Sequence, residues 1–172
     1  MNAIILLIPI LLLRYALLGG LSKEALKRAV FLPPMDGKKR ATLWIYLISN
    51  IALFLYLFFI QIRIVPGWFY LGLILFVLGT VLYAVSIINF ARPNANGVNQ
   101  KGLYRVSRHP MYVAFFIYFL GCVLLTQSLV LLAILLVFQI SSHWIILSEE
   151  SWCVKEFGEE YITYMKKVRR YI

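Results

Sequence analysis

Long uninterrupted runs of apolar residues dominate this sequence and restrict the folds open to it. A helix needs about 20 residues, at 1.5 Å each, to cross a hydrocarbon core of roughly 30 Å. Hydrophobic residues make up 62% of the 172 residues and charged residues 14%, against about 25% charged in ordinary soluble domains. The pattern predicts a single-domain, all-α, polytopic membrane protein and excludes a soluble globular domain. We expect five transmembrane helices, over Ala3–Leu18, Thr42–Ile62, Gly67–Phe90, Met111–Leu125 and Leu129–Leu147.

Two of these stretches have unusual features. The first contains Pro9 and Arg14, and we interpret it as a retained span because no basic segment or cleavage site marks a signal peptide. The fourth would be only about 22 Å long, and Thr126-Gln127-Ser128 is all that joins it to the fifth. We therefore expect a helical hairpin whose cytosolic end lies deep and leaves room for a pocket.

The basic residues predict the orientation. The net charge is +10, and fifteen of the seventeen basic residues lie between the first and second stretches, between the third and fourth, or after the fifth. These segments share one side, which the positive-inside rule assigns to the cytosol, with the N-terminus outside and the C-terminus inside. The charge thus marks topology and does not indicate a nucleic-acid partner. The expected location is the cell membrane in a prokaryote and the endoplasmic reticulum in a eukaryote.

The connection at residues 89–112 carries the first candidate site. The stretch from Arg92 to Asn99 is rich in Asn and Gly, which tolerate left-handed backbone. Exposed backbone N–H groups in such a loop suit a carboxylate or a ribose. Pro110 fits the first turn of the fourth helix, which places His109 at the helix N-terminus, where anions are favoured. The alternative is an interfacial basic loop anchored by tyrosines.

Polar residues near the end of the fifth stretch form the second candidate site. Gln139, His143 and Glu150 share one helical stripe, and polar groups at membrane depth usually face a bundle interior or a wet cavity. His143 suits a site or a hydrogen bond between helices. The adjacent carboxylates of Glu149 and Glu150 suit a cationic ligand such as an ammonium or a sulfonium. They equally suit a solvated helix end paired with Arg or Lys.

The C-terminal segment predicts a separate cytosolic helix. Gly158 can end the preceding helix, and the two glutamates after it suit the start of a new one. Tyr161, Met165 and Val168 share a face that lies on the membrane or covers a pocket.

Several enzyme classes lack their motifs in this sequence. It contains no GxGxxG, P-loop, GxSxG or HExxH pattern. His109 and His143 are its only histidines, so we expect no metal site.

Two spaced patterns resemble those of the isoprenylcysteine carboxyl methyltransferase family, membrane-embedded enzymes that use S-adenosylmethionine without a soluble Rossmann domain. The pattern G-x-Y-x-x-x-R-H-P-x-Y is met by Gly102, Tyr104, Arg108, His109, Pro110 and Tyr112. A second pattern, E-E, six residues and F-G-x-x-Y-x-x-Y, is met by Glu149, Glu150, Phe157, Gly158, Tyr161 and Tyr164. Both occur in the family's order, separated by a helical hairpin, and the resemblance covers residues 89–170.

The resemblance implies that S-adenosylmethionine is the cofactor. Its pocket would lie between the cytosolic loop, the start of the fourth helix and the end of the fifth. Glu149 matches a cofactor-contacting acid of the family, and its charge suits the ammonium and sulfonium of the cofactor. No catalytic residue is assigned. The implied cofactor-binding residues are Asn89, Asn96, Gly97, Val98, Asn99, Tyr104, Arg108, His109, Pro110, Met111, Tyr112, Glu149 and Glu150.

The resemblance also implies a lipophilic acceptor that enters from the bilayer, the family's own being the carboxylate of a prenylated cysteine. Family members with that activity carry an Arg one turn before Glu149, where this chain has Ile145. Arg can hold a carboxylate bidentately, and Ile cannot. Methyl transfer to a phospholipid amine or a small thiol is one alternative, and a non-catalytic membrane binding or transport protein is another. The predicted substrate positions are His143, Ile145, Tyr161 and Arg170.

Overall fold

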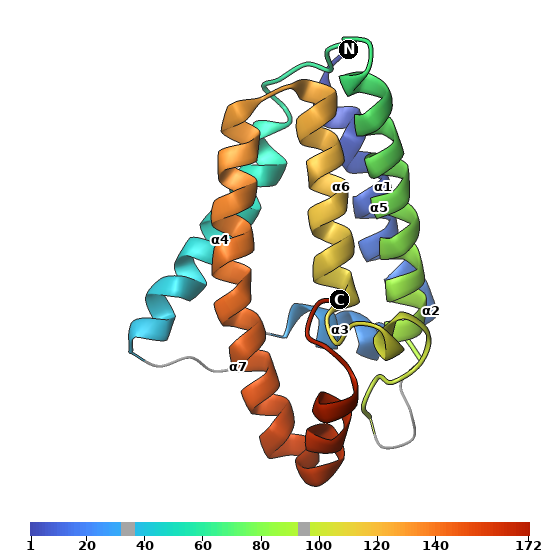
Figure 1. Ribbon diagram of the computed structural model, residues 1–172, viewed down its shortest axis with the longest axis vertical. Coiled ribbons are helices and arrows are strands. Elements are labelled where there is room, and N and C mark those ends of the chain that lie inside the picture. The colour runs from blue at the N-terminus through green and yellow to red at the C-terminus, as the bar shows by residue number, and fades with distance from the viewer. Residues whose placement is uncertain (32–36, 93–96) are drawn as a thin grey trace.

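The computed structural model describes residues 1–31, 37–92 and 97–172, and its long segments are helical (Figure 1). Helices run side by side along the long axis, and the connections at the two ends differ in length. We call the end that holds α3, residues 97–109 and the last part of α7 the loop end. The elements are η1 (Ala3–Leu7), α1 (Ile8–Leu11), η2 (Leu12–Leu17), α2 (Leu18–Leu21), α3 (Lys23–Val30), α4 (Lys38–Tyr56), α5 (Trp68–Phe90), η3 (Gly102–Arg105), α6 (Pro110–Thr126) and α7 (Leu129–Lys167).

Three helices of the described residues are long and apolar enough to cross a membrane. They are Ala3–Leu21, which joins η1, α1, η2 and α2, together with α5 and α7. The apolar helices Arg40–Tyr56 and α6 are shorter. An isolated membrane-spanning segment has to be helical because lipid offers no partners for backbone N–H and C=O groups. The expected all-α fold is confirmed for the described residues, with three helices suited to crossing a membrane, while the five-span topology and its orientation stay predictions.

The expected second span is wrong over its last residues, because α4 ends at Tyr56 and not at Ile62. The chain there makes backbone hydrogen bonds to other segments. The N–H of Ala3 donates to the carbonyl of Ile60 at 3.0 Å, and the N–H of Ile62 donates to the carbonyl of Met1 at 2.9 Å. These bonds hold the N-terminus against the α4–α5 connection.

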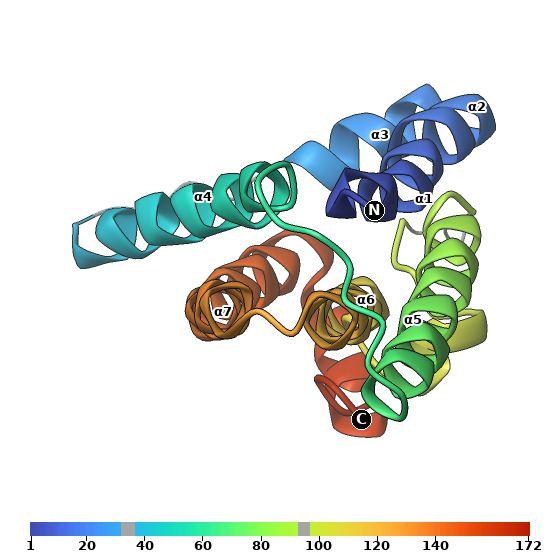
Figure 2. The ribbon, with the colours of Figure 1, turned by 90° about the horizontal axis from the view of Figure 1, so that it is seen from above.

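The α6–α7 connection is a tight hairpin, as its length predicts. Gln127 ends α6 in the left-handed conformation with φ 50°, and Ser128 caps α7 by accepting from the N–H of Leu131 at 3.2 Å. In the view along the bundle, α6 lies between α5 and α7 (Figure 2).

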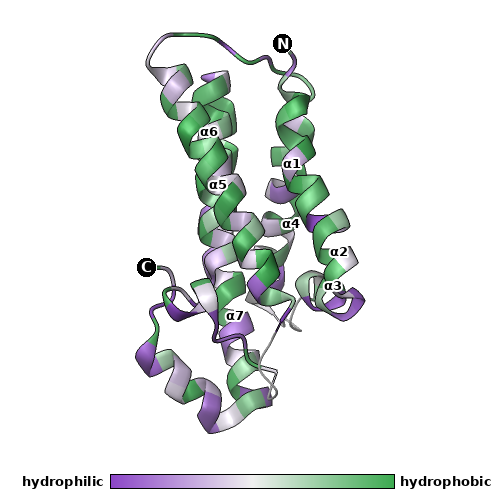
Figure 3. Ribbon diagram, turned by 90° about the vertical axis from the view of Figure 1, so that its right-hand side faces the viewer, coloured by the Kyte–Doolittle hydropathy of each residue, from purple (hydrophilic) through white to green (hydrophobic). Residues whose placement is uncertain are grey.

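Helix α7 is too long to lie wholly in a bilayer. Its continuous part, residues 129–157 before the turn at Gly158, is about 43 Å long at 1.5 Å per residue, against a hydrocarbon core of roughly 30 Å. Its apolar first half leads into a hydrophilic second half at the loop end (Figure 3). Gly158 adopts φ 55°, so the chain turns there and a last helical segment follows, as the sequence predicts.

Helices α5 and α6 pack closely enough to require glycine at the contact. A Cβ added at Gly79 would overlap the backbone of Tyr118, and one added at Gly121 would overlap the backbone of Phe76. Small residues of this kind let membrane helices approach one another. This contact fixes the position of α6, which begins within the R-H-P-x-Y motif.

We predict that Gly79→Ala destabilises the protein by about 1–3 kcal/mol through overpacking. The matched control is Gly20→Ala, since a Cβ there has no atom within 4 Å. The measurement is the melting temperature in detergent. Equal melting temperatures for the two variants would contradict the close α5–α6 contact.

Candidate functional site

The R-H-P-x-Y motif lies where the loop enters α6. His109 is the N-cap residue of α6 and Pro110 its first residue, as predicted. Ser107 accepts a hydrogen bond from the backbone N–H of His109 at 3.2 Å and donates to the carbonyl of Arg170 at 3.2 Å. The N–H of Arg108 donates to the carbonyl of Arg169 at 3.0 Å. The C-terminal residues therefore run beside the motif and are bonded to its backbone.

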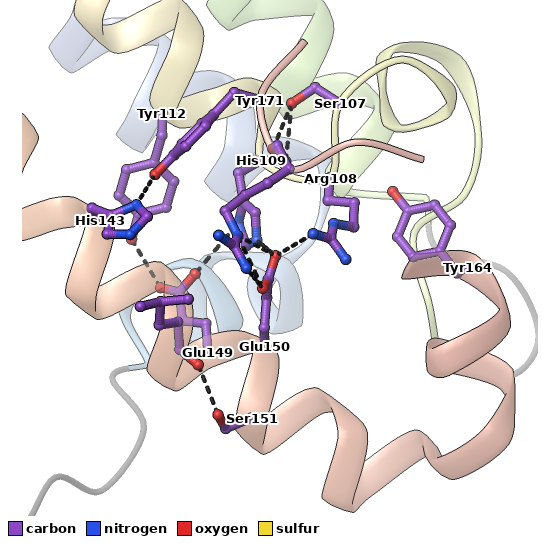
Figure 4. A network of polar contacts seen from close by, with 12 residues as sticks. Ser107, Arg108, His109, Tyr112, His143, Glu149, Glu150, Ser151, Tyr164 and Tyr171 are labelled. Carbon is purple, nitrogen blue, oxygen red and sulfur yellow. Dashed lines mark hydrogen bonds and ion pairs between the residues drawn. The ribbon is translucent and has the colours of Figure 1, made fainter. Parts of the chain in front are cut away.

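Glu150 joins this loop, α7 and the C-terminus through one buried carboxylate (Figure 4). Arg170 donates to both carboxylate oxygens, with its terminal nitrogen 2.8 Å from Oε2. Arg108 lies 3.1 Å from Oε1, and His109 Nε2 lies 3.3 Å from the same oxygen. The side chain of Glu150 is 4% exposed. Two arginines and a histidine thus surround a carboxylate that water scarcely reaches.

The charge state of Glu150 follows from these partners. Burial opposes ionisation, but the hydrogen bonds from His109 and Arg170 and the charge of Arg108 outweigh it and lower the pKa of Glu150 to about 2. The carboxylate is therefore ionised and fully engaged, which makes it a structural anchor.

Glu149 has different surroundings although it is the next residue. It accepts a hydrogen bond from the hydroxyl of Tyr112 at 2.8 Å, and His109 Nδ1 lies 3.7 Å from its other oxygen. Its side chain is 26% exposed. Burial raises the pKa of Glu149, and the proximity of His109 limits that rise. No arginine pairs with it among the residues that the structure describes.

A cavity of about 570 Å³ opens beside Glu149. This volume lies within the range of about 300–1,000 Å³ that is typical of small-molecule sites. Its wall includes residues deep in the helices, such as Asn50, Phe115 and Phe138, as well as loop residues. The cavity therefore connects the loop end with the apolar part of the bundle. The predicted site residues on its wall are Gly97, Val98, Asn99, Tyr104, Arg108, His109, Met111, Tyr112, Glu149 and Tyr161.

The other predicted residues lie behind this wall or away from it. Asn89 packs directly against Gly102, whose φ of 56° and missing Cβ permit the contact. Pro110 begins α6, and Glu150 and Arg170 form the anchor described above. Asn96 lies outside the described residues.

Two predicted substrate positions lie elsewhere in α7. Ile145 is fully buried and is not part of the cavity wall. His143 Nδ1 lies 2.8 Å from the hydroxyl of Tyr171, so it contacts the C-terminal tail. The bond runs to the tail and not to another helix, so the role of His143 as a substrate position stays a prediction.

The last helical segment covers the cavity. Tyr161 and Tyr164 pack with Val98, and Met165 and Val168 join the same apolar cluster. The hydroxyl of Tyr164 donates to the carbonyl of Tyr104 at 2.6 Å. Of the two predicted orientations for this face, the structure has the one that covers the pocket.

The N-terminal half supplies part of the wall that the sequence did not indicate. Arg14 comes from η2, Arg28 from α3, Tyr46 from α4 and Tyr83 from α5. The phenol groups of Tyr46 and Tyr112 interact, which connects this side of the cavity to Glu149. The sequence did carry a signal for part of this wall, since a charged or amide side chain inside an apolar stretch usually marks a functional site. Arg14 and Asn50 both fit that description.

A model of the phospholipid methyltransferase family matches residues 68–160. The chain belongs to this family. The match spans α5, α6 and α7 as far as residue 160, so it includes the first motif and the second motif up to Gly158. The protein is therefore a membrane methyltransferase. The family lies in the same membrane methyltransferase superfamily as the isoprenylcysteine carboxyl methyltransferases. The predicted activity is therefore confirmed at the level of the superfamily. A search of curated proteins finds no match.

The cavity fits the cofactor that such methyltransferases generally use, S-adenosylmethionine. Glu149 offers a carboxylate that no described arginine neutralises, which suits the cationic end of the cofactor. Asn99 Oδ1 and Arg108 Nε are buried without a hydrogen-bond partner among the described residues, and both residues are part of the wall. Buried polar atoms normally have partners, so a ligand would satisfy an acceptor and a donor that the protein leaves open.

The depressed pKa of Glu150 predicts a specific loss of stability in acid. Below about pH 4.5 the unfolded chain binds a proton at this carboxylate, while the folded chain does not until about pH 2. The stabilisation from Glu150 is therefore fully present above pH 4.5 and is lost as the pH falls toward 2. Near neutral pH, Glu150→Gln should cost about 3–5 kcal/mol because it leaves buried cations unpaired.

The measurement is the difference in melting temperature between wild type and Glu150→Gln across this pH range. The difference should shrink toward zero as the pH approaches 2, and a difference that stays constant would contradict the anchor.

Proposed function

We propose that this protein transfers a methyl group from S-adenosylmethionine to a lipid whose headgroup enters the cavity beside Glu149. The observation that carries this proposal is the cavity itself, which combines a carboxylate without a described arginine partner, polar atoms without a described hydrogen-bond partner and an apolar extension into the bundle. In the predicted topology of five spans, its loop end lies in the cytosol, where a soluble cofactor is available.

Glu149 is the acidic side chain of the described cavity wall. When bound, the cofactor supplies a methyl group on a positively charged sulfur, which is reactive toward nucleophiles. Tyr112 donates to one oxygen of Glu149 and so fixes the direction of the carboxylate. Asn99 and Arg108 lie on the same cavity wall and would bind polar groups of the cofactor. The protein thereby positions the cofactor and compensates its charge.

The apolar part of the wall suits a lipid acceptor. Phe115 and Phe138, whose ring centroids are 5.0 Å apart, come from α6 and α7 within the membrane part of the bundle. A chain lying against these rings would direct its headgroup toward Glu149. Bringing acceptor and methyl group together in a site that excludes water accounts for much of the rate of such transfers.

The protein's cysteine in the cavity wall does not suit a covalent intermediate. Burial raises the pKa of Cys153 to about 11, so its thiol is protonated at neutral pH. Direct transfer from cofactor to acceptor is the simpler reaction, and it requires only that the acceptor present a free electron pair.

The family match favours the amine of a phospholipid as acceptor. Such an amine carries a proton in water and must lose it before it attacks the methyl group. Glu149 on the cavity wall would take up this proton, because its raised pKa makes it a stronger base than an exposed carboxylate.

The carboxylate of a prenylated cysteine is the second acceptor to consider. It is favoured by the two motifs and needs no base, because a carboxylate is already ionised. Ile145 disfavours this acceptor, because it stands where the isoprenylcysteine carboxyl methyltransferases have a carboxylate-binding Arg. It is apolar, buried and not part of the cavity wall, so it cannot bind a carboxylate.

We predict that Glu149→Gln weakens binding of S-adenosylhomocysteine by about tenfold or more, because a partly buried charge pair is lost. Glu156→Gln, an exposed change on the same helix, is the control and should bind like wild type. Calorimetry in detergent measures both. Unchanged binding by Glu149→Gln would remove Glu149 from the site. Absence of binding by the wild type, even at millimolar ligand, would contradict the enzyme and leave a non-catalytic role.

The acceptor is identified by supplying S-adenosylmethionine with a labelled methyl group. We expect label in phosphatidylethanolamine presented in mixed micelles. Label that appears instead in N-acetylfarnesylcysteine, and that mild base releases as methanol, would assign the carboxylate. Label in a simple thiol would exclude both lipid acceptors.

A further inference from the structure

Arg14 is a cation inside an apolar membrane helix. It lies in η2, a stretch of π-helix from Leu12 to Leu17, and its side chain is part of the cavity wall. Short π-helical segments are rare and occur often at functional sites. A charge at this depth is costly and is usually retained for a ligand or a transport step.

The hydrogen-bond partners of Arg14 among the described residues are neutral. Its guanidinium donates to the hydroxyl of Tyr83 at 3.4 Å and to the carbonyl of Ala29 at 3.3 Å. The ion pairs of the described residues involve Arg108, His109 and Arg170, and none includes Arg14. The positive charge is therefore held in place and left uncompensated within that part of the chain.

Two further cations lie on the same wall. Lys27 and Arg28 come from α3, which follows the first membrane helix directly. Arg28 donates to the carbonyl of Phe90 at 3.3 Å, and its guanidinium carbon lies 5.0 Å from the centre of the Phe90 ring. Neither residue forms an ion pair with a described acidic side chain. The cavity thus has a basic wall from η2 and α3 and an acidic residue, Glu149, on α7.

We propose that Arg14, assisted by Lys27 and Arg28, binds the anionic group of the lipid acceptor. The proposal rests on the proposed function and specifies the substrate class: a lipid whose headgroup carries one negative charge close to the methyl-accepting atom. The planar geometry of a guanidinium group suits phosphodiesters and carboxylates equally well. The anion would lie near Arg14, the reacting atom toward Glu149, and the chains against Phe115 and Phe138.

The kinetic test compares Arg14→Gln and Arg28→Gln with Arg63→Gln, an exposed control in the α4–α5 connection. We expect KM for the lipid to rise about tenfold in each site variant, with the Kd for S-adenosylhomocysteine unchanged, and Arg14→Lys to retain part of the affinity. Arg28 is exposed, so its variant should fold even if Arg14→Gln does not. The proposal is overturned if the two variants weaken cofactor binding instead, because the basic wall then serves the cofactor.

A binding test separates this inference from the proposed function because it needs no methyl transfer. The probes are short-chain phosphatidylmethanol, which is a phosphodiester without an amine, diacylglycerol with the same chains, N-acetylfarnesylcysteine and its methyl ester. The readout is the fluorescence of Trp152 in the cavity wall, with Trp152→Phe as the reference for signal from other tryptophans. We expect each anionic probe that binds to do so at least about tenfold more tightly than its neutral partner, and Arg14→Gln and Arg28→Gln to remove the difference. Preference for the phospholipid identifies a phosphodiester, and preference for the farnesylcysteine identifies a carboxylate. Equal binding of anionic and neutral probes overturns the inference. If the anion preference is present and no lipid gains a methyl group, the proposed function fails and the anion site stands.

Discussion

The buried carboxylate of Glu150 is the contact on which the site depends. It joins α7, the loop before α6 and the C-terminal residues, which are far apart in the sequence, through Arg108, His109 and Arg170. A buried charge is stable only when its partners satisfy it well, and breaking such a set leaves uncompensated charges. The anchor therefore holds His109 at the start of α6, keeps the tail beside the loop, and positions the last helical segment over the cavity.

Two adjacent carboxylates perform different tasks because of helix geometry. Successive residues of a helix point about 100° apart, so Glu150 faces the tail while Glu149 faces the cavity. The environment then separates their acidities: arginines and His109 lower the pKa of Glu150, and burial raises that of Glu149. Divergent pKa values in a pair of neighbouring acids are typical of functional sites. The pair combines the two alternatives that the sequence left open, an arginine-paired carboxylate and one without a described arginine partner, which suits a cationic ligand.

Local signals in the sequence predicted more of this molecule than long-range ones did. Apolar runs predicted the helices, Pro110 the start of α6, and Gly158 the turn in α7, because each effect depends on neighbouring residues. The predicted end of the second span was wrong because the chain after α4 forms hydrogen bonds to Met1 and Ala3, about sixty residues away. The motifs located the C-terminal half of the cavity wall. The basic wall was not predicted, since the contact of Arg14 with Tyr83 depends on how the first helix packs against α5.

Opposite charges in one apolar cavity suit a family that joins a cationic cofactor to a lipid. Glu149 would compensate the cofactor and the basic wall the lipid, so that the two meet between them. The most direct test is an experimental structure with S-adenosylhomocysteine bound. The account predicts the ligand in the cavity, its ammonium within hydrogen-bonding distance of Glu149 and its polar groups near Asn99 and Arg108. A ligand bound outside this cavity, or one that leaves Glu149 without a contact, would contradict the account.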